Sequence, residues 1–233
     1  MPSTTDNRLY FKQLLAGRDF ARDDQIAQQM VNFVYLVGDR ETGEAVAIDP
    51  AYGPAELVEI LDADGMRLTG ALITHYHPDH CGGKLGSWSL AGVAELLAQP
   101  KFSGKVHVQH EEANGMKFVT GCSDSDLELH RSGDVIEVGD IRITLIHTPG
   151  HTPGSQCFFV DGRLVSGDTL FLDGCGRTDL PGGDSAALYE SITQKLAIVP
   201  DDAVLYPGHL YSPEPFLPMG EVRRRNYVFD AFG

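Results

Sequence analysis

The chain has 233 residues, 42% of them hydrophobic and 22% charged, which predicts one soluble globular domain spanning residues 1–233. The 33 acidic residues outnumber the 18 basic ones and give a net charge of −15, which argues against a nucleic-acid partner. No apolar run approaches the ~18 residues that span a bilayer and the first twenty residues lack the layout of a secretory signal, so we expect no membrane association and a cytoplasmic location.

The first third of the chain predicts a hairpin, a helix and a further strand. Residues 32–37 and 45–48 are short β-branched and aromatic runs around a Gly-containing turn, which indicates a hairpin. Pro54 suits the first position of a helix whose apolar residues then recur every three and four positions. A strand over 70–73 follows, and it leads directly into the polar segment THYHPDH at 74–80.

The rest of the chain predicts mainly strands and one capped helix. The dipeptides Gly139-Asp140 and Asp161-Gly162 each join two apolar runs, which is typical of hairpins. Asp184 can cap a helix that continues to about residue 196. The expected elements are a helix over 90–98, strands from 105 and over 135–138, 141–146, 157–160 and 163–166, a helix over 184–196 and a strand over 203–206. Their irregular alternation predicts a layered α/β sandwich with polar loops at the strand ends.

Three histidines and an aspartate lie within six positions after the strand over 70–73, and such polar density at a strand end indicates a metal site. In an extended segment alternate side chains share a face, so His75 and His77 can point at one ion. Pro78 then bends the chain, which would direct Asp79 and His80 towards a second ion. Imidazole and carboxylate are ligands that Zn²⁺, Fe²⁺ and Mn²⁺ accept.

Three later residues each stand just past a predicted strand, where a rigid sheet can hold a ligand in place. They are His151, Asp168 and His209. A single histidine near a turn is more often a surface or satisfied core residue than a ligand, so the prediction depends on the set as a whole.

The segments THYHPDH at 74–80, GHT at 150–152, GDT at 167–169 and GH at 208–209 together resemble the metallo-β-lactamase-fold superfamily, in that order along the chain. The resemblance covers about residues 32–209 and implies an αββα four-layer sandwich with a dinuclear site at one edge of the sheets. By position it implies one divalent ion bound by His75, His77 and His151, a second bound by Asp79, His80 and His209, and Asp168 between them. Zinc is expected, with iron or manganese as alternatives.

Such a site implies a binuclear metallohydrolase, because two cations that share a water lower its pKa and supply a bridging hydroxide near neutral pH. Asp79 is expected to orient that hydroxide, in addition to or instead of ligation. Within the family, residues 167–171 and GCGRTD at 174–179 look closest to glyoxalase II-type thioesterases (hydroxyacylglutathione hydrolases) and to persulfide dioxygenases. Both groups act on glutathione-like thiol derivatives.

The thioesterase interpretation is favoured because all seven ligand positions are filled and residues 180–184 resemble small hydrolases of that branch. In the dioxygenase alternative, one Fe(II) would be bound by His75, His151 and Asp168, leaving positions for O₂ and a persulfide. A lactonase, with Tyr206 or Tyr211 donating to an oxyanion, is a third alternative. A non-catalytic metal-binding module is the alternative from a different class of protein.

Substrate contacts are expected outside the metal ligands. An acidic protein repels an anionic thiol substrate at long range, so a local cation is needed, and Arg177 is the predicted substrate-binding residue. Residues 84–103 are interpreted either as a lid carrying Trp88 or as a surface helix. The basic run at 223–225 either binds carboxylates or, as favoured, forms the solvated face of a C-terminal helix. Oligomeric state is not readable from the sequence.

Overall fold

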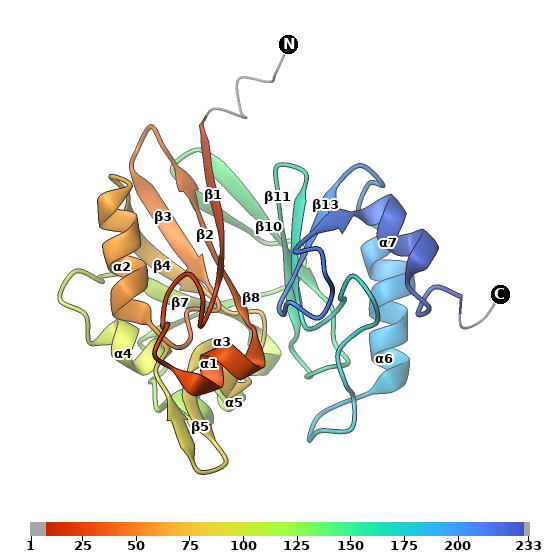
Figure 1. Ribbon diagram of the computed structural model, residues 1–233, viewed down its shortest axis with the longest axis horizontal. Helices are drawn as coiled ribbons and strands as arrows, with labels where there is room; N and C mark the ends of the chain where they lie inside the picture. The colour runs from red at the N-terminus through yellow and green to blue at the C-terminus, as the bar shows by residue number, and fades with distance from the viewer. Residues whose placement is uncertain (1–7, 231–233) are drawn as a thin grey trace.

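The computed structural model describes residues 8–230; residues 1–7, part of the stretch inspected for a signal, and residues 231–233 lie outside the described part. Two six-stranded sheets pack face to face and carry helices on their outer sides, which gives four layers (Figure 1). The predicted αββα sandwich is therefore confirmed. None of the helices within 8–230 is both long and apolar enough to cross a bilayer.

The first sheet contains the N-terminal strands. In spatial order they are β1 (Leu9–Leu15), β2 (Phe33–Asp39), β3 (Glu44–Ile48), β4 (Arg67–Leu72), β7 (Lys105–Gln109) and β8 (Leu127–His130). The predicted hairpin is the antiparallel pair β2–β3, whereas β3, β4, β7 and β8 run parallel to one another. Because parallel strands end at the same edge, the loops after β3, β4 and β7 meet there.

The second sheet contains the C-terminal strands. In spatial order they are β14 (Leu217–Pro218), β13 (Val204–Pro207), β12 (Arg163–Gly167), β11 (Gln156–Val160), β10 (Ile141–His147) and β9 (Val135–Val138). Both predicted hairpins form, β9–β10 and β11–β12, and β13 runs parallel to β12. The loops that follow β12 and β13 therefore also lie at one edge of the sheet.

Seven α-helices are present in the described chain: α1 (Gln25–Met30), α2 (Pro54–Ala63), α3 (Pro78–Cys81), α4 (Val93–Leu97), α5 (Ala113–Thr120), α6 (Ser185–Glu190) and α7 (Met219–Arg225). As expected, Pro54 begins α2, and Asp184 caps α6 by accepting hydrogen bonds from the amides of Ala186 and Ala187. The α6 chain continues through a π turn over Ser191–Lys195 and a 3₁₀ turn over Leu196–Ile198, so the helical stretch predicted over 184–196 is confirmed.

Separate apolar clusters hold the layers together. Between the sheets, Tyr35 and Ile48 of the first sheet pack with Ile143 and Phe158 of the second. On the outside of the first sheet, α2 buries Leu57 and Leu61, and a further cluster packs against α5. On the outside of the second sheet, Leu188, Ile192 and Val222 cover the strands. Burial of apolar area on both faces of each sheet fixes the sheets rigidly under the strand-end loops.

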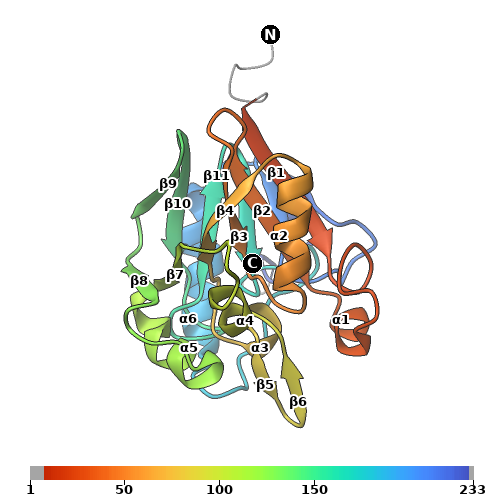
Figure 2. The same ribbon diagram turned by 90° about the vertical axis from the view of Figure 1, so that its left-hand side faces the viewer.

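Residues 84–103 do not form one surface helix, and the alternative interpretation, a lid carrying Trp88, stays a prediction. They contain a small hairpin, β5 (Gly83–Leu85) and β6 (Trp88–Leu90), followed by α4, and the hairpin projects from one end of the molecule (Figure 2). The helix predicted over 90–98 is shorter because β6 takes up Leu90. Trp88 lies beside the hairpin turn with 55% of its surface exposed. Strand β1 and helices α1 and α5 were not among the predicted elements.

Candidate metal centre

Four strand-end loops meet at one edge of the two sheets and bring the predicted ligands together. The loop after β4 carries His75 and His77, and the short helix α3 that follows carries Asp79 and His80. The loops after β10, β12 and β13 of the second sheet carry the remaining three, His151, Asp168 and His209. The site therefore exists only where the two sheets face each other.

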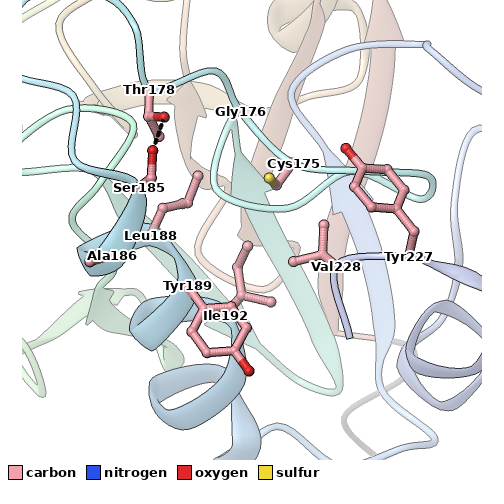
Figure 3. A pocket seen from close by; sticks show the side chains of 10 residues that line it. All are labelled: Cys175, Gly176, Thr178, Ser185, Ala186, Leu188, Tyr189, Ile192, Tyr227 and Val228. Atoms are coloured by element: carbon pink, nitrogen blue, oxygen red, sulfur yellow. Dashed lines mark hydrogen bonds between the residues drawn. The ribbon is translucent and has the colours of Figure 1, made fainter. Parts of the chain in front are cut away.

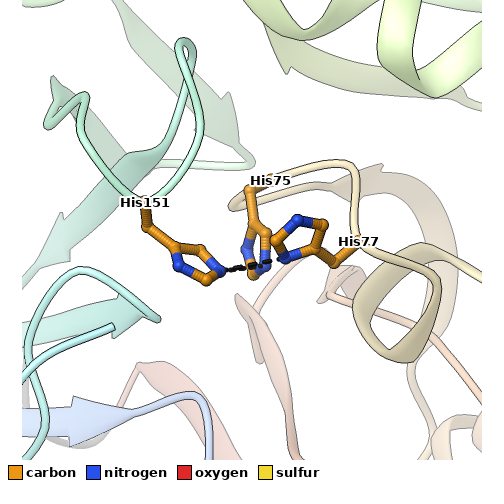
Figure 4. Close-up of side chains that lie close together, drawn as sticks. All are labelled: His75, His77 and His151. Atoms are coloured by element: carbon orange, nitrogen blue, oxygen red, sulfur yellow. Dashed lines mark hydrogen bonds between the residues drawn. The ribbon is translucent and has the colours of Figure 1, made fainter. Parts of the chain in front are cut away.

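Three imidazoles form the first group of donors. The Nε2 atom of His151 lies 3.2 Å from Nε2 of His75 and 2.9 Å from Nδ1 of His77. Figure 4 shows the three rings turned towards one another, His151 from one side and His75 and His77 from the other. On the far side of its ring, the Nδ1 atom of His151 lies 2.7 Å from the carbonyl oxygen of Arg177. The group therefore presents three nitrogens, all within 4.8 Å of one another, that could hold one ion.

One carboxylate and two imidazoles form the second group. The Nε2 atoms of His80 and His209 lie 3.2 Å apart, and each is 3.4 Å from Oδ2 of Asp79. Both rings are fixed from behind: Nδ1 of His80 lies 2.9 Å from Oδ2 of Asp49, and Nδ1 of His209 lies 2.8 Å from the carbonyl oxygen of Met30. A partner on the second nitrogen sets the ring orientation of a metal-binding histidine.

Asp168 stands between the two groups. Its Oδ1 atom is 3.3 Å from Nε2 of both His80 and His209, and its Oδ2 atom is 3.6 Å from Nε2 of His151. Within the described chain, Oδ1 is buried without a hydrogen-bond partner, which is costly for a carboxylate unless a cation compensates it. A Cβ atom at Gly208 would come within 2.5 Å of this oxygen, so the glycine keeps the space beside it clear. The donor set therefore fits divalent cations.

The pKa shifts of the histidines at this site also fit the binding of cations. Burial lowers the pKa of His77 to about 4, and burial together with the neighbouring imidazoles lowers the pKa of His75 well below its ordinary value. Burial acts in the same direction on His209, but the carboxylates of Asp168 and Asp79 outweigh it and raise the pKa of His209 to about 9. Without a metal the two carboxylates thus hold a proton where a divalent cation would displace it.

A cavity of about 580 Å³ opens onto both groups of donors. Arg177, the predicted substrate-binding residue, lies at the wall of this cavity, and its guanidinium group is paired with the carboxylate of Asp179 at 2.7 Å and is largely exposed. Tyr211 also lines the cavity, and its ring stacks on His209 with centroids 4.6 Å apart. Tyr206 does not line it, because its ring packs against Phe11 in the aromatic cluster between the sheets. Of the two predicted tyrosines, only Tyr211 is at the site.

A second, apolar cavity of about 500 Å³ adjoins the first and shares Cys175, Gly176 and Tyr227 with it. Figure 3 shows the side chains that line it, from the loop after β12, from α6 with its π turn, and from the C-terminal segment. Its apolar lining comes mainly from Leu188, Ile192 and Val228. The site thus has a polar cavity at the donors and an apolar one beside it.

The arginine run at the end of α7 is mostly paired. Arg225 donates to Asp173 at 2.6 Å and to Glu214 at 3.3 Å, and Arg223 binds Asp201 and the carbonyl oxygens of residues 196 and 199. Two of the three arginines therefore fasten the C-terminal helix to its surroundings. Of the three, only Arg224 is exposed, as the favoured solvated-face interpretation expected of all three.

Two buried carboxylates that the sequence analysis missed hold the ligand loops in place. Asp49, at the end of β3, accepts hydrogen bonds from the amide and hydroxyl of Thr74 at 2.8 and 2.6 Å, and it adopts a φ of +54°. Glu112 accepts from the amide of Tyr76 at 2.7 Å, the hydroxyl of Thr152 at 2.7 Å and the amide of Gly154 at 2.6 Å. The position of Asp49 after a predicted strand was a usable signal, whereas nothing in the sequence near Glu112 marked it.

Comparison with known proteins agrees with this geometry. The family model described as the metallo-β-lactamase superfamily matches residues 28–209. A hydroxyacylglutathione hydrolase from Rhodopseudomonas palustris is 40% identical over 183 residues, which is 78% of this chain and 63% of the hydrolase. The human mitochondrial persulfide dioxygenase ETHE1 is 33% identical over 183 residues, 77% of this chain and 64% of the dioxygenase. This chain thus matches less than two thirds of the length of either relative.

Among solved structures, ETHE1 from Myxococcus xanthus superimposes with a TM-score of 0.75 at 28% identity, covering 95% of this chain and 85% of that protein. The thioesterase-like and dioxygenase-like relatives are thus similar to this chain to a comparable degree, and the specific activity is not separated by them. On the family model, the relatives and the fold together, the chain belongs to the metallo-β-lactamase superfamily.

Proposed function

We propose that this protein is a binuclear metal-dependent hydrolase that cleaves small-molecule thioesters, glutathione conjugates among them. The observation that carries the proposal is the shared position of Asp168, which lies within 3.6 Å of ligand nitrogens from both donor groups and keeps one buried oxygen without a hydrogen bond. A carboxylate in that position suits two ions better than one. The hydroxyacylglutathione hydrolase relative supports the thioester as substrate.

The residues that would hold the ions follow from the two groups. One ion would be bound by His75, His77 and His151, and the other by Asp79, His80 and His209, with Asp168 between them. Such a pair of ions, when bound, supplies an activated water near neutral pH and polarises the carbonyl that is attacked. Zinc is our expectation, and iron or manganese accept the same nitrogen and oxygen donors.

The protein's own contribution is to orient these donors before the substrate arrives. Asp49 and the carbonyl of Met30 hold the rings of His80 and His209 from behind. Asp79 lines the cavity and receives a hydrogen bond at 3.2 Å from the side-chain amide of Asn32, which fixes one carboxylate oxygen. We assign to Asp79 the orientation of the attacking water. A thiolate leaves readily, so the reaction needs no strong general acid.

The two adjoining cavities suit the two halves of a thioester. The polar cavity offers Arg177 and the donor groups to an anionic thiol, and the apolar cavity offers Leu188, Ile192 and Val228 to an apolar acyl group. Tyr227 lines both cavities, so its side chain would touch the substrate near the junction. We therefore expect thioesters with an apolar acyl group to be preferred over those with a short polar one.

A persulfide dioxygenase is the second candidate, because His151 approaches both His75 at 3.2 Å and Asp168 at 3.6 Å. Two imidazoles and one carboxylate form the ligand set of many non-haem Fe(II) enzymes that use O₂. The human ETHE1 relative supports this alternative. In that case His80 and His209 would lie outside the iron's ligand set.

Metal content and substrate turnover, measured on one preparation, distinguish these candidates. The protein is purified without added metal, its metals are identified and counted, and it is then assayed for thioester hydrolysis, lactone hydrolysis and O₂ uptake with glutathione persulfide. Two metals per chain with thioester cleavage is the expected result. One iron per chain with persulfide-dependent O₂ uptake would instead establish the dioxygenase, and retained metal without any turnover would indicate a non-catalytic metal-binding module.

A pair of variants links the outcome to the site. Asp168→Ala should lose metal and all activity, because the carboxylate adjoins both donor groups. Asp161→Asn is the matched control, since Asp161 lies in the β11–β12 turn and tolerates asparagine at its φ of +44°. An Asp168→Ala protein with wild-type metal content and turnover would contradict the assignment of the site.

A further inference from the structure

A separate group of imidazole and carboxylate side chains lies on β7 and β8, the last two strands of the first sheet (Figure 2). In the parallel register, His107 is the partner of Glu128, and His130 lies two residues further along β8. Residues two apart on a strand share a face, so all three side chains lie on one side of the sheet. The intervening Val106, Val108 and Leu127 pack on the other side, in the cluster with Met116 of α5.

The donor atoms of the three side chains lie close enough together to contact one ion. Nδ1 of His107 and Nε2 of His130 lie 2.9 Å apart. Nδ1 of His107 is 3.8 Å from Oε2 of Glu128, and Nε2 of His130 is 3.8 Å from the other carboxylate oxygen, Oε1. One donor atom from each of the three residues lies within 4.8 Å of the other two, which is close enough for a single Zn²⁺ ion to contact two imidazole nitrogens and one carboxylate oxygen. The 2.9 Å approach of the two ring nitrogens equals that between His151 and His77 in the metal centre.

The surroundings of these residues also resemble those of metal ligands. The other ring nitrogen of His130, Nδ1, lies 3.6 Å from Oδ2 of Asp134. That carboxylate is itself held by the amide of Arg131 at 2.8 Å. In the strand-end centre a carboxylate behind a histidine orients the ring by a hydrogen bond, as Asp49 does for His80 at 2.9 Å; Asp134 lies on the corresponding side of His130, beyond direct hydrogen-bond distance. The net charge of −15 further favours a cation over an anion at this position.

We propose that His107, Glu128 and His130 form an additional divalent-metal site, distinct from the strand-end centre, that binds Zn²⁺ through two nitrogens and a carboxylate. The side chain of Glu128 is half exposed, so water completes the coordination and the ion exchanges with solvent. Because its ligands come from adjacent strands, the bound ion ties the edge strand β8 to β7. The site does not depend on the proposed hydrolase activity.

Zinc binding by matched variants tests the proposal. The full chain is dialysed against graded free Zn²⁺, and bound zinc per chain is counted for wild type, His130→Ala, Glu128→Gln and the control His110→Ala. His110 is a suitable control because it is half exposed and, among residues 8–230, meets a single carboxylate, that of Glu111, at 3.9 Å. The count is compared between proteins, so the result does not depend on how many ions the strand-end centre holds.

Wild type and His110→Ala should bind one more equivalent of zinc than His130→Ala. In Glu128→Gln the dissociation constant for that equivalent should rise at least tenfold, while the turnover measured in parallel stays at the wild-type value. Titration of wild type with Zn²⁺ should also shift the imidazole NMR signals of His107 and His130, but not that of His110. Since Glu128 is exposed, its variant keeps the test valid if His130→Ala does not fold.

Equal zinc counts in wild type, His130→Ala and Glu128→Gln would overturn the proposal and leave a hydrogen-bonded pair of neutral histidines. Loss of the extra equivalent in His110→Ala as well would also overturn it, by showing that the zinc binds to surface histidines in general.

Discussion

Replacing Glu112 with glutamine should destabilise the contact between the two loops that carry His75, His77 and His151. Glu112 is fully buried, and its carboxylate receives three hydrogen bonds: one from the loop carrying His75 and His77, through the amide of Tyr76, and two from the loop carrying His151, through Thr152 and Gly154. A glutamine can keep its single oxygen towards Thr152 and Gly154. Its NH₂ group then faces the amide of Tyr76, and two donors are buried against each other.

The size of the effect follows from these contacts. Loss of one buried hydrogen bond to a charged group costs about 1.5–3 kcal/mol, and the two that remain become weaker because the acceptor is neutral. Burial raises the pKa of Glu112, because the buried charge is poorly solvated. A neutral glutamine avoids that desolvation cost, which offsets part of the lost stability. We therefore expect the free energy of unfolding to fall by about 2 kcal/mol, which is roughly thirtyfold in the unfolding equilibrium of a domain stable by about 5–15 kcal/mol.

The measurement is urea unfolding of chelator-treated protein, so that metal binding does not add to the difference. Circular dichroism is the suitable signal, because the single tryptophan, Trp88, is 55% exposed and reports poorly on the core. Glu111→Gln is the control, since that side chain is exposed and lies 3.9 Å from the imidazole of His110. Glu112→Gln should also lower the affinity of His75, His77 and His151 for their metal ion roughly tenfold. A Glu112→Gln protein within about 0.5 kcal/mol of both wild type and control would refute the reasoning.

Three further outcomes are expected. Removal of metal by a chelator should abolish turnover, and added Zn²⁺ should restore it in wild type but not in Asp168→Ala, as a turnover assay before and after re-addition would show. Arg177→Ala should raise KM roughly three- to tenfold with little change in kcat, because the exposed guanidinium lies at the cavity wall; an unchanged KM would remove it from the substrate site. Arg8 donates to Asp39 at 2.8 and 2.7 Å and holds the pKa of that carboxyl well below its ordinary value. The ion pair therefore stabilises the fold above about pH 4, and this stabilisation is lost as the pH falls further. Asp39→Asn should therefore flatten the acid side of the stability profile in chemical unfolding, and an unchanged profile would count against the ion pair.

Local signals in the sequence were sufficient to find the side chains that meet at the candidate metal centre and to predict much of the fold. The donors at 75–80 and the later His151, Asp168 and His209 follow strands that were recognisable from apolar runs and turn residues, and the structure brings all seven together. Pro54 and Asp184 mark helix starts through effects that act within one turn.

What the sequence did not predict depends on contacts between distant segments. Glu112 is meaningful only because the loops at 76 and 152–154 meet around it, at separations of 36 and about 40 residues. His107 and His130 become neighbours only through the parallel pairing of β7 with β8. Residues 84–90 are an exception, because their hairpin is local: its turn is Gly86-Ser87, with Gly86 at a φ of +61°, and the interpretation as a surface helix overlooked this turn signal.

The division of the metal centre between the two sheets has a consequence for the order of events during biosynthesis. Four of its donors lie before residue 81 and the other three lie between 151 and 209, so a growing chain holds an incomplete set until His209 has been made. The proposed metal binding would then wait until both halves have folded and docked, since neither sheet presents all seven donors alone. In a refolding experiment, uptake of the last ion should accordingly lag behind the formation of secondary structure and coincide with the joining of the two sheets.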